Sequence, residues 1–352
     1  MTPSLDGPPR RHFASDNYAG ICPEAWEAMA RANAGHVPGY GDDAWTERAA
    51  ALVRELFETD CEVFLVFNGT SANALAVAAL CRPWHAVACH EVAHVSTDEC
   101  AAPELLGGGV KVIPLAGPQG KVTPEALRRL AGRRDDVHFP RVRAVSLTQA
   151  TELGTVYRPA EVAALAEAAR GLGIRLHVDG ARFANAVASL GLSPAALSWQ
   201  AGVDVLSLGG TKDGMAAGEA VVFFDRELAR EFAWRRKQAG QLASKMRFLA
   251  APWVGMLESG AWLRNARHAN AMAARLEAAV RAAPGVRLLQ PREANAVFAA
   301  IPGPAVAALH GRGWRFYDFE IWGGSRLMCS WDTAPEDVDR FASDLREVMG
   351  GI

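Results

Sequence analysis

The feature that most constrains this chain is a regular alternation of short apolar runs with longer amphipathic stretches. Nearly continuous apolar runs are typical of strands that are covered on both faces. We expect strands at residues 63–67, 86–89, 110–115, 143–148, 175–178, 203–208 and 220–224. Helices are expected between them at residues 71–81, 97–106, 124–131, 159–171 and 194–200. The alternation predicts an α/β fold with a mainly parallel sheet of about seven strands and helices on both faces.

The pattern changes after residue 225, where the next 58 or so residues look almost wholly helical, with a break expected near Pro252. Further strands are expected at residues 286–289, 295–301, 314–319 and 326–331, with helices near 304–311 and from Pro335 onward. A length of 352 residues suits two domains. We therefore expect an N-terminal arm (1–14), a large domain (15–252) and a small C-terminal α+β domain (253–352), with a long helix over 253–282 at the boundary.

Charge and composition exclude several classes of protein. The net charge is −2, so a basic surface for nucleic acid or anionic lipid is not expected. No apolar run reaches the roughly 18 residues of a membrane span, and the N-terminus lacks the apolar core of a signal peptide. The six cysteines show no CxxC spacing, so we expect reduced thiols in a cytoplasmic protein.

Ligands of open α/β sheets bind at the carboxyl ends of the strands, which makes those positions the candidate site. After the first strand, Gly69, Thr70 and Ser71 stand at a predicted helix start, where they form either a simple helix cap or a phosphate site. Asp179 ends another strand. It either forms an ion pair with Arg182 or binds a protonated ring nitrogen of a cofactor.

A lysine follows the strand expected at 203–208, directly after Thr211. Lys212 is one of only five lysines among 37 basic residues, and its side chain either turns to solvent or places an amine in the crevice. The other four lysines, which fit a strand end less well, are Lys111, Lys121, Lys237 and Lys245. A phosphate site, an aspartate for a ring nitrogen and an amine are together the contacts that pyridoxal 5′-phosphate requires.

The segment HEVAH at residues 90–94 matches a zinc protease motif, which requires both histidines on one helix. Here the motif follows a predicted strand directly, so we expect a loop and no metal site. His94 is instead a candidate to stack on a flat cofactor ring, and His90 is expected at the surface.

The chain resembles the low-specificity L-threonine aldolases of the β-eliminating-lyase group, which are fold-type-I enzymes that use pyridoxal 5′-phosphate. The resemblance covers about residues 12–349. It rests on the segments FASDNYAG, GYGDDAWT, FNGTSAN, HEVAH, SLTQATELGTVY, HVDGARFANAV, LSLGGTKDG, FAWRRKQAG and SRLMCSWDT. Of these, HVDGARFANAV and the lysine of GTKDG are the most specific.

The resemblance implies a role for each matching residue. Lys212 would attach the cofactor covalently, Asp179 would bond its pyridine nitrogen, and His94, oriented by Glu99, would stack on its ring. Further cofactor contacts would come from Gly69, Thr70, Thr211 and Arg182. The substrate carboxylate would be bound by Arg182, Arg326 and Ser15, with Tyr40 reaching across a subunit interface and Asp16 in a structural role.

The function implied is cleavage of L-threonine, L-allo-threonine and related β-hydroxy-α-amino acids to glycine and an aldehyde, in a homodimer or homotetramer. A phenylserine aldolase, another β-eliminating lyase, a catalytically silent cofactor-binding protein and a zinc hydrolase are the alternatives. One segment departs from the family. Where many members carry a histidine near the substrate hydroxyl, residues 148–152 have none, which leaves His94, a bound water or Thr151 as the base.

Overall fold

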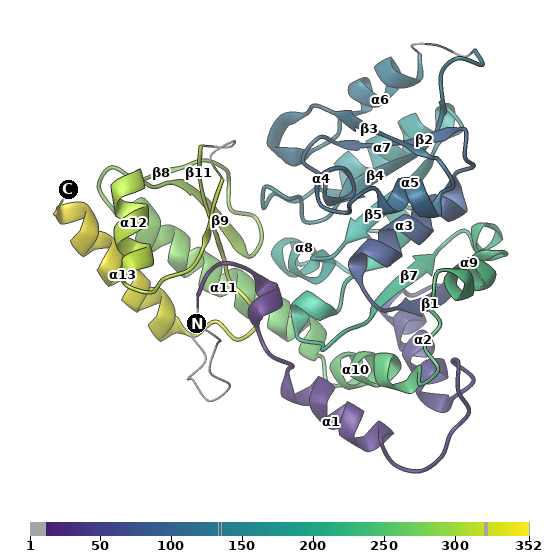
Figure 1. The fold of residues 1–352 in the computed structure, drawn as a ribbon, viewed down its shortest axis with the longest axis horizontal. Coiled ribbons are helices and arrows are strands. Elements are labelled where there is room, and N and C mark those ends of the chain that lie inside the picture. Colours follow the sequence, from purple (N-terminus) through teal and green to yellow (C-terminus); the bar gives the residue numbers. More distant parts are fainter. Residues whose placement is uncertain (1–11, 133, 135, 320–322, 352) are drawn as a thin grey trace.

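The computed structural model describes residues 12–132, 134, 136–319 and 323–351. Its larger part is a seven-stranded sheet in the order β1-β7-β6-β5-β4-β2-β3 (Figure 1). The strands are β1 (Glu62–Val66), β2 (His85–His90), β3 (Lys111–Leu115), β4 (Arg141–Thr148), β5 (Arg175–Gly180), β6 (Val205–Leu208) and β7 (Glu219–Phe223). Strands β2 to β6 run parallel, and β7 runs antiparallel to β6 and β1. The predicted mainly parallel sheet is confirmed.

Helices cover both faces of this sheet, because alternate side chains of each strand point to opposite sides. In β7, Ala220 and Val222 belong to one apolar cluster, and Val221 and Phe223 belong to another. The first cluster includes residues of α2 (Ala44–Phe57), α6 (Pro124–Ala131), α7 (Pro159–Gly171), α8 (Phe183–Leu190) and α10 (Arg247–Glu258). The second includes residues of α3 (Gly69–Leu80) and α9 (Phe232–Gln238).

The helices differ from the prediction in several places, and those at Pro23–Ala32 and Ala44–Phe57 were not predicted. The helix expected at 97–106 is two short ones, α4 (His94–Thr97) and α5 (Ala102–Leu106), because Cys100 and Ala101 adopt left-handed φ angles of 48° and 59° between them. The helix expected at 194–200 is a set of turns followed by a 3-10 turn at Trp199–Ala201, since Ser198 leaves the helical region. Helix α8 was not predicted.

Pro252 does not break its helix, so the expected break and the long helix over 253–282 are both wrong. Helix α10 continues through Pro252 because the run Leu249–Met256 is buried, and it packs against α1 (Pro23–Ala32) and α2. The free energy gained by burying these side chains outweighs the loss of the one backbone hydrogen bond that a proline removes. The break lies instead at Gly260, whose φ is +71°, and α11 (Ala261–Arg281) follows it.

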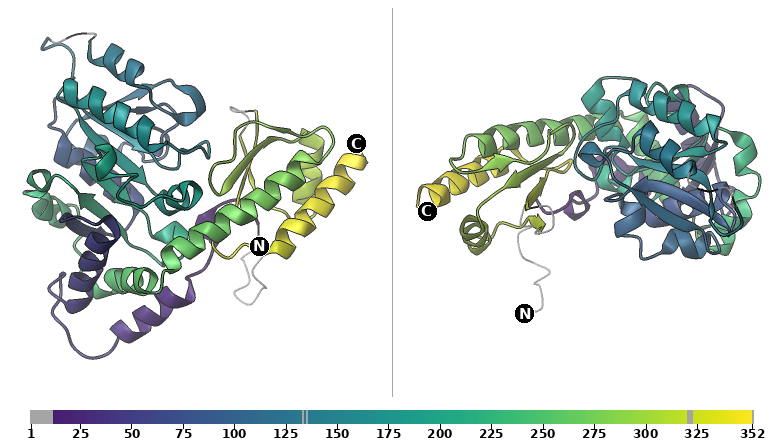
Figure 2. Two further views of the ribbon diagram at one scale, coloured as in Figure 1. Left: turned by 180° about the vertical axis from the view of Figure 1, so that it is seen from behind. Right: turned by 90° about the horizontal axis from the view of Figure 1, so that it is seen from above.

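Helix α11 extends from the large part to a second, smaller sheet (Figures 1 and 2). This four-stranded antiparallel sheet has the order β10-β11-β9-β8. Its strands are β8 (Arg287–Leu288), β9 (Ala296–Ala300), β10 (Tyr317–Phe319) and β11 (Gly324–Met328), and it is accompanied by helices α12 (Gly303–Gly311) and α13 (Pro335–Gly350). The predicted small α+β part is confirmed.

The N-terminal chain packs on this smaller part. Phe13 is buried, with its ring 5.7 Å from Trp314 and 5.3 Å from Phe341 between centroids. Its N–H donates to Arg315 and its carbonyl accepts from Met328. Residues 12–14 therefore differ from the expected arm, and residues 1–11 lie outside the described residues. In the described part of the chain, no helix has the length and apolar character needed to cross a membrane.

Candidate active site

The carboxyl ends of three neighbouring strands form one edge of the large sheet. Thr148 of β4 pairs in register with Asp179 of β5, and Asp179 pairs with Ser207 of β6. The segments that follow these strands therefore leave the sheet side by side. Helix α3 begins at the same edge, because β1 runs parallel to β6 through two antiparallel pairings.

A chain of hydrogen bonds links Asp179 to His94. Asn73 on α3 donates from Nδ2 to Asp179 Oδ2 at 2.9 Å and to Glu99 Oε1 at 2.8 Å. Glu99 Oε1 lies 2.9 Å from Nδ1 of His94, and Asp179 Oδ1 accepts the Ala181 N–H at 3.1 Å. The predicted proximity of Glu99 to His94 is thus observed. Asn73 was not predicted, although a buried polar residue inside the apolar helix 69–80 was a usable signal.

The contact between Glu99 and His94 shifts the pKa values of both groups. The hydrogen bond from Glu99 raises the pKa of His94, the charges of Asp179 and Glu152 add to this effect, and burial opposes it. Burial also raises the pKa of Glu99, against the hydrogen bonds from His94 and Asn73. We take the ionised pair as the relevant state, since the Glu99 side chain is fully buried but bonded to both partners.

The HEVAH segment does not form a single helix. His90 is the last residue of β2, a turn follows, and His94 is the first residue of α4. His90 is buried, with Nε2 3.0 Å from the Gly117 carbonyl oxygen and Nδ1 accepting the Val92 N–H, so its expected surface position is wrong. Among the described residues, no group of three or more His, Cys, Asp and Glu side chains is arranged to hold a metal ion.

Lys212 lies in the short turn Thr211–Asp213, four residues beyond the end of β6. The turn is held by Glu219 of β7, whose Oε2 accepts the Gly210 N–H at 2.5 Å and which also bonds Thr211. Burial raises the pKa of Glu219, while these bonds and the charge of Lys212 oppose the rise. The Lys212 amine has no hydrogen bond or ion pair to another described side chain.

Two other lysines are occupied elsewhere. Lys121 pairs with Glu161 at 3.0 Å, and the Lys237 amine lies 4.6 Å from the centre of the Tyr40 ring. Lys111 is the first residue of β3 and is exposed. Its position after the end of a strand therefore still favours Lys212 as the lysine that places an amine in the crevice.

The start of α3 presents unbonded backbone groups at the same edge. Asn68 caps the helix, because its Oδ1 accepts the Ser71 N–H at 2.9 Å. The amides of Gly69 and Thr70 have no acceptor among the described residues. A side chain added at Gly69 would meet no atom within 4 Å, so the space beside this turn is open. An anion fits there.

Arg182 forms a buried ion pair with Asp16. Its Nε and Nη2 donate to the two oxygens of Asp16 at 2.7 and 2.9 Å, and Asn295 adds a third bond to Asp16 at 3.2 Å. Burial alone would raise the pKa of Asp16, but the charge and hydrogen bonds of Arg182 outweigh it and lower the pKa. Asp179, by contrast, has no ion pair with Arg182 within the described contacts, so the simple pairing expected between them is not seen.

The remaining predicted residues lie on three other segments. The guanidinium carbon of Arg326 on β11 lies over the rings of Tyr317 and Phe319, 5.2 and 5.5 Å from their centres, and the buried Nε has no partner among the described residues. Its Nη2 donates to the carbonyl of Ala14, which places it beside Ser15. Tyr40 lies away from these residues in an exposed turn, with 53% of its surface accessible.

Several known proteins resemble this chain. The family model described as "Beta-eliminating lyase" matches residues 12–302. A "Low specificity L-threonine aldolase" of Pseudomonas aeruginosa is 60% identical, over 97% of this chain and 98% of that protein. A protein of the same name from a Pseudomonas species is 58% identical over 96% and 98%. The structure of Leishmania major threonine aldolase superposes with a TM-score of 0.90 at 29% identity, over 96% of this chain and 99% of that one.

The family model covers most of the chain, and the relatives cover nearly all of it. Of the motifs that carried the resemblance, those with Asp179, His94 and Lys212 follow strands β5, β2 and β6 at one edge of the large sheet. The expectation drawn from the sequence is confirmed: the chain belongs to the beta-eliminating lyase family.

Proposed function

We propose that this chain is a pyridoxal 5′-phosphate enzyme that cleaves L-threonine, L-allo-threonine and related β-hydroxy-α-amino acids to glycine and an aldehyde. The observation that carries the proposal is the grouping of Lys212, Asp179 and His94 at one sheet edge. The proposal is supported by the names of the relatives that are 60% and 58% identical over nearly the whole chain.

The residues at this edge fit the cofactor. Lys212 offers an amine that is free of ion pairs among the described residues, and Asp179 offers a carboxylate that is fixed by Asn73 and the Ala181 amide. The open space at Gly69 lies beside two unbonded amides, as a phosphate group requires. When bound, the cofactor supplies an electron sink for the bond that breaks at the substrate α-carbon.

The protein's own groups then have distinct tasks. Lys212 attaches the cofactor through its amine, and Thr211, Gly69 and Thr70 hold its phosphate. Asp179 keeps a proton on the ring nitrogen, because an anionic partner stabilises the protonated form. The imidazole of His94, which is bonded to Glu99, would stack on the cofactor ring.

The substrate carboxylate is bound by arginine. Arg326 has an unsatisfied Nε, and the guanidinium fork matches a carboxylate in two hydrogen bonds. Arg182 contributes its remaining nitrogen, Nη1, because its Nε and Nη2 already donate to Asp16. Ser15 completes this end of the site from the N-terminal segment.

A second copy of the chain completes the site in this proposal, as a homodimer or homotetramer in the cytoplasm. The exposed ring of Tyr40 supports it, as does Trp234 on neighbouring α9, which is 73% accessible. Light scattering on the purified protein gives the mass of the assembly directly. A monomer that is fully active would contradict this part of the proposal.

The reaction is tested by product analysis with the cofactor-loaded protein. Incubation with L-threonine is expected to yield glycine and acetaldehyde in equal amounts, measured by proton NMR. A 2-oxo acid and ammonia without glycine would identify a β-eliminating lyase and overturn the aldolase proposal. Turnover of phenylserine with no turnover of threonine would replace the proposed substrate by an aryl one.

A further inference from the structure

Glu152 lies in the turn that follows β4, at the sheet edge where β5 carries Asp179. The backbone N–H of Gln149 donates to the carbonyl of Asp179 at 2.8 Å, which continues the strand pairing of Thr148 with Asp179. Glu152 follows three residues later and its side chain is partly exposed. Its carboxylate therefore leaves the sheet at the same edge as the groups assigned to the cofactor.

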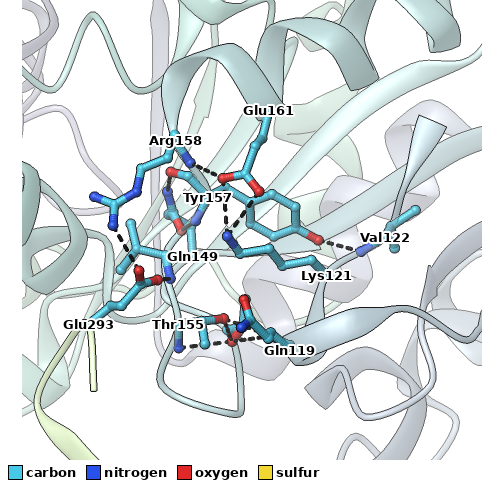
Figure 3. A network of polar contacts seen from close by, with 11 residues as sticks. Gln119, Lys121, Val122, Gln149, Thr155, Tyr157, Arg158, Glu161 and Glu293 are labelled. Atoms are coloured by element: carbon cyan, nitrogen blue, oxygen red, sulfur yellow. Dashed lines mark hydrogen bonds and ion pairs between the residues drawn. The ribbon is translucent and has the colours of Figure 1, made fainter. Parts of the chain in front are cut away.

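Hydrogen bonds within the large part of the structure hold the turn that carries Glu152 in place. Thr151 N–H donates to Thr155 O at 2.9 Å, and the two threonine hydroxyl oxygens lie 2.7 Å apart. Thr155 Oγ1 also donates to the Gln119 carbonyl at 2.7 Å, as Figure 3 shows. The side chain of Gln149 bonds both backbone groups of Tyr157, at 2.9 and 3.0 Å.

The smaller part of the structure holds the same turn through Glu293. Its Oε2 accepts the Val156 N–H at 2.7 Å, and its Oε1 accepts from Arg158 Nη2 at 2.7 Å (Figure 3). The Glu293 N–H donates to the carbonyl of Gly154, two residues after Glu152. The backbone of the turn that carries Glu152 is therefore anchored from both parts of the structure.

The charge of Glu152 acts on groups from three other segments. After the hydrogen bond from Glu99, it adds to the rise in the pKa of His94. Burial lowers the pKa of Arg326, and the charge of Glu152 opposes this. The pKa of Arg182 is raised chiefly by Asp16, against burial, and Glu152 contributes in the same direction. The turn after β4 thus brings the Glu152 carboxylate close enough to these three side chains for its charge to act on each of them.

The other candidate bases near these side chains are already occupied. Thr151 is buried and its hydroxyl is bonded to Thr155, so the earlier expectation that it acts as the base is not supported. Both oxygens of Asp16 accept from Arg182, and Glu99 is bonded to His94 and Asn73. The Nδ1 of His94 is bonded to Glu99, and this hydrogen bond raises the pKa of the imidazole. No hydrogen bond from another described residue reaches the Glu152 carboxylate.

We propose that the carboxylate of Glu152 accepts the proton of the substrate β-hydroxyl group; the proposal rests on the aldolase function given above. The O–H bond breaks as its proton passes to a Glu152 oxygen, and the C–O bond becomes the carbonyl of the aldehyde. The Cα–Cβ bond breaks at the same time, and its electron pair stays on the α-carbon. That carbon later takes up a proton, so glycine and the aldehyde together contain every atom of the substrate.

The test compares two reactions of the same cofactor-loaded enzyme. Cleavage of L-threonine needs a base for the β-hydroxyl, whereas exchange of the glycine α-proton with deuterated water does not. In Glu152→Gln we expect kcat/KM for threonine to fall by about 10²–10⁴-fold. Glycine exchange, followed by NMR, and glycine affinity, followed by the cofactor absorbance, are expected to match those of the wild type. Glu91→Gln, an exposed carboxylate in the turn after β2, is the matched control and should change neither reaction.

Each result decides the proposal. Equal threonine cleavage by Glu152→Gln and the wild type would overturn it while leaving the aldolase function intact. Parallel loss of cleavage and glycine exchange would overturn it too, since it would assign Glu152 a positioning role at Arg326 or His94. Glu152→Asp retains the carboxylate and is expected to recover part of the cleavage, and no recovery would count against a proton acceptor. If the wild type forms no glycine from threonine, the proposed function itself has failed.

Discussion

Replacement of Asp16 by asparagine perturbs the buried ion pair at the centre of the site. The Asp16 side chain is 1% accessible and that of Arg182 is 9% accessible, and the two are joined by hydrogen bonds of 2.7 and 2.9 Å. Asparagine retains the shape and one acceptor but leaves the guanidinium charge without its anion. Breaking a buried pair in this way costs about 3–5 kcal/mol in the free energy of unfolding.

The loss in the free energy of unfolding is also expected to depend on pH, in a direction that the pKa of Asp16 determines. The pKa of Asp16 is lowered in the folded protein, because Arg182 outweighs the opposing effect of burial. A carboxylate with a lowered pKa stabilises the fold above its unfolded pKa, and that stabilisation is lost as the pH falls through the folded pKa. The difference between wild type and Asp16→Asn is therefore expected to be largest near neutral pH and to shrink in acid.

Urea unfolding of the cofactor-loaded protein measures this difference. Asp339 provides a matched control, because it bonds Arg275 with the same two-point geometry, at 2.8 and 2.6 Å, on the surface. Asp339→Asn should leave the free energy of unfolding nearly unchanged, since exposed pairs contribute little. Equal losses in the two variants, or a loss for Asp16→Asn that does not depend on pH, would refute the argument from burial.

Three further predictions concern side chains around the same edge. Removing the carboxylate in Glu99→Gln should lower the pKa of His94, measured by NMR titration of its ring; an unchanged pKa would show that Glu99 does not stabilise the imidazolium. His177, buried between Ser146 and Ser207, has a pKa lowered by burial to about 4, so its ring nitrogens should report a neutral imidazole at pH 5, and a charged ring there would be inconsistent with this burial. Asn73→Ala removes the bridge between Asp179 and Glu99, so dialysis should strip the cofactor faster than from the wild type; equal retention would contradict the role given to that bridge.

The strands were predictable because each of them alternates between two apolar surroundings. Ala220 and Val222 face one cluster while Val221 and Phe223 face the other, so neither face tolerates polar residues and the run reads as a buried strand. Asp179 and Lys212 were predictable from their strands, since a charged residue at the carboxyl end of such a strand or in the turn after it lies at the sheet edge.

Other features depend on contacts between distant segments and were not predictable. The helix through Pro252 is maintained by its packing against α1 and α2, which local sequence does not reveal. The role of Asn73 becomes visible only because Glu99, from the turn between α4 and α5, and Asp179, from β5, both contact it. The charge of Glu152 likewise becomes informative only once the fold brings Arg326, from the smaller sheet, within reach of that charge.

The central claim is that one sheet edge holds a cofactor bound covalently through Lys212. Treatment of the cofactor-loaded protein with borohydride makes such an attachment permanent, and peptide mass spectrometry then locates it among the five lysines of the chain. The account predicts the added mass on the peptide that contains Lys212 and on no other. An adduct on Lys121, on Lys237 or on no lysine at all would contradict it.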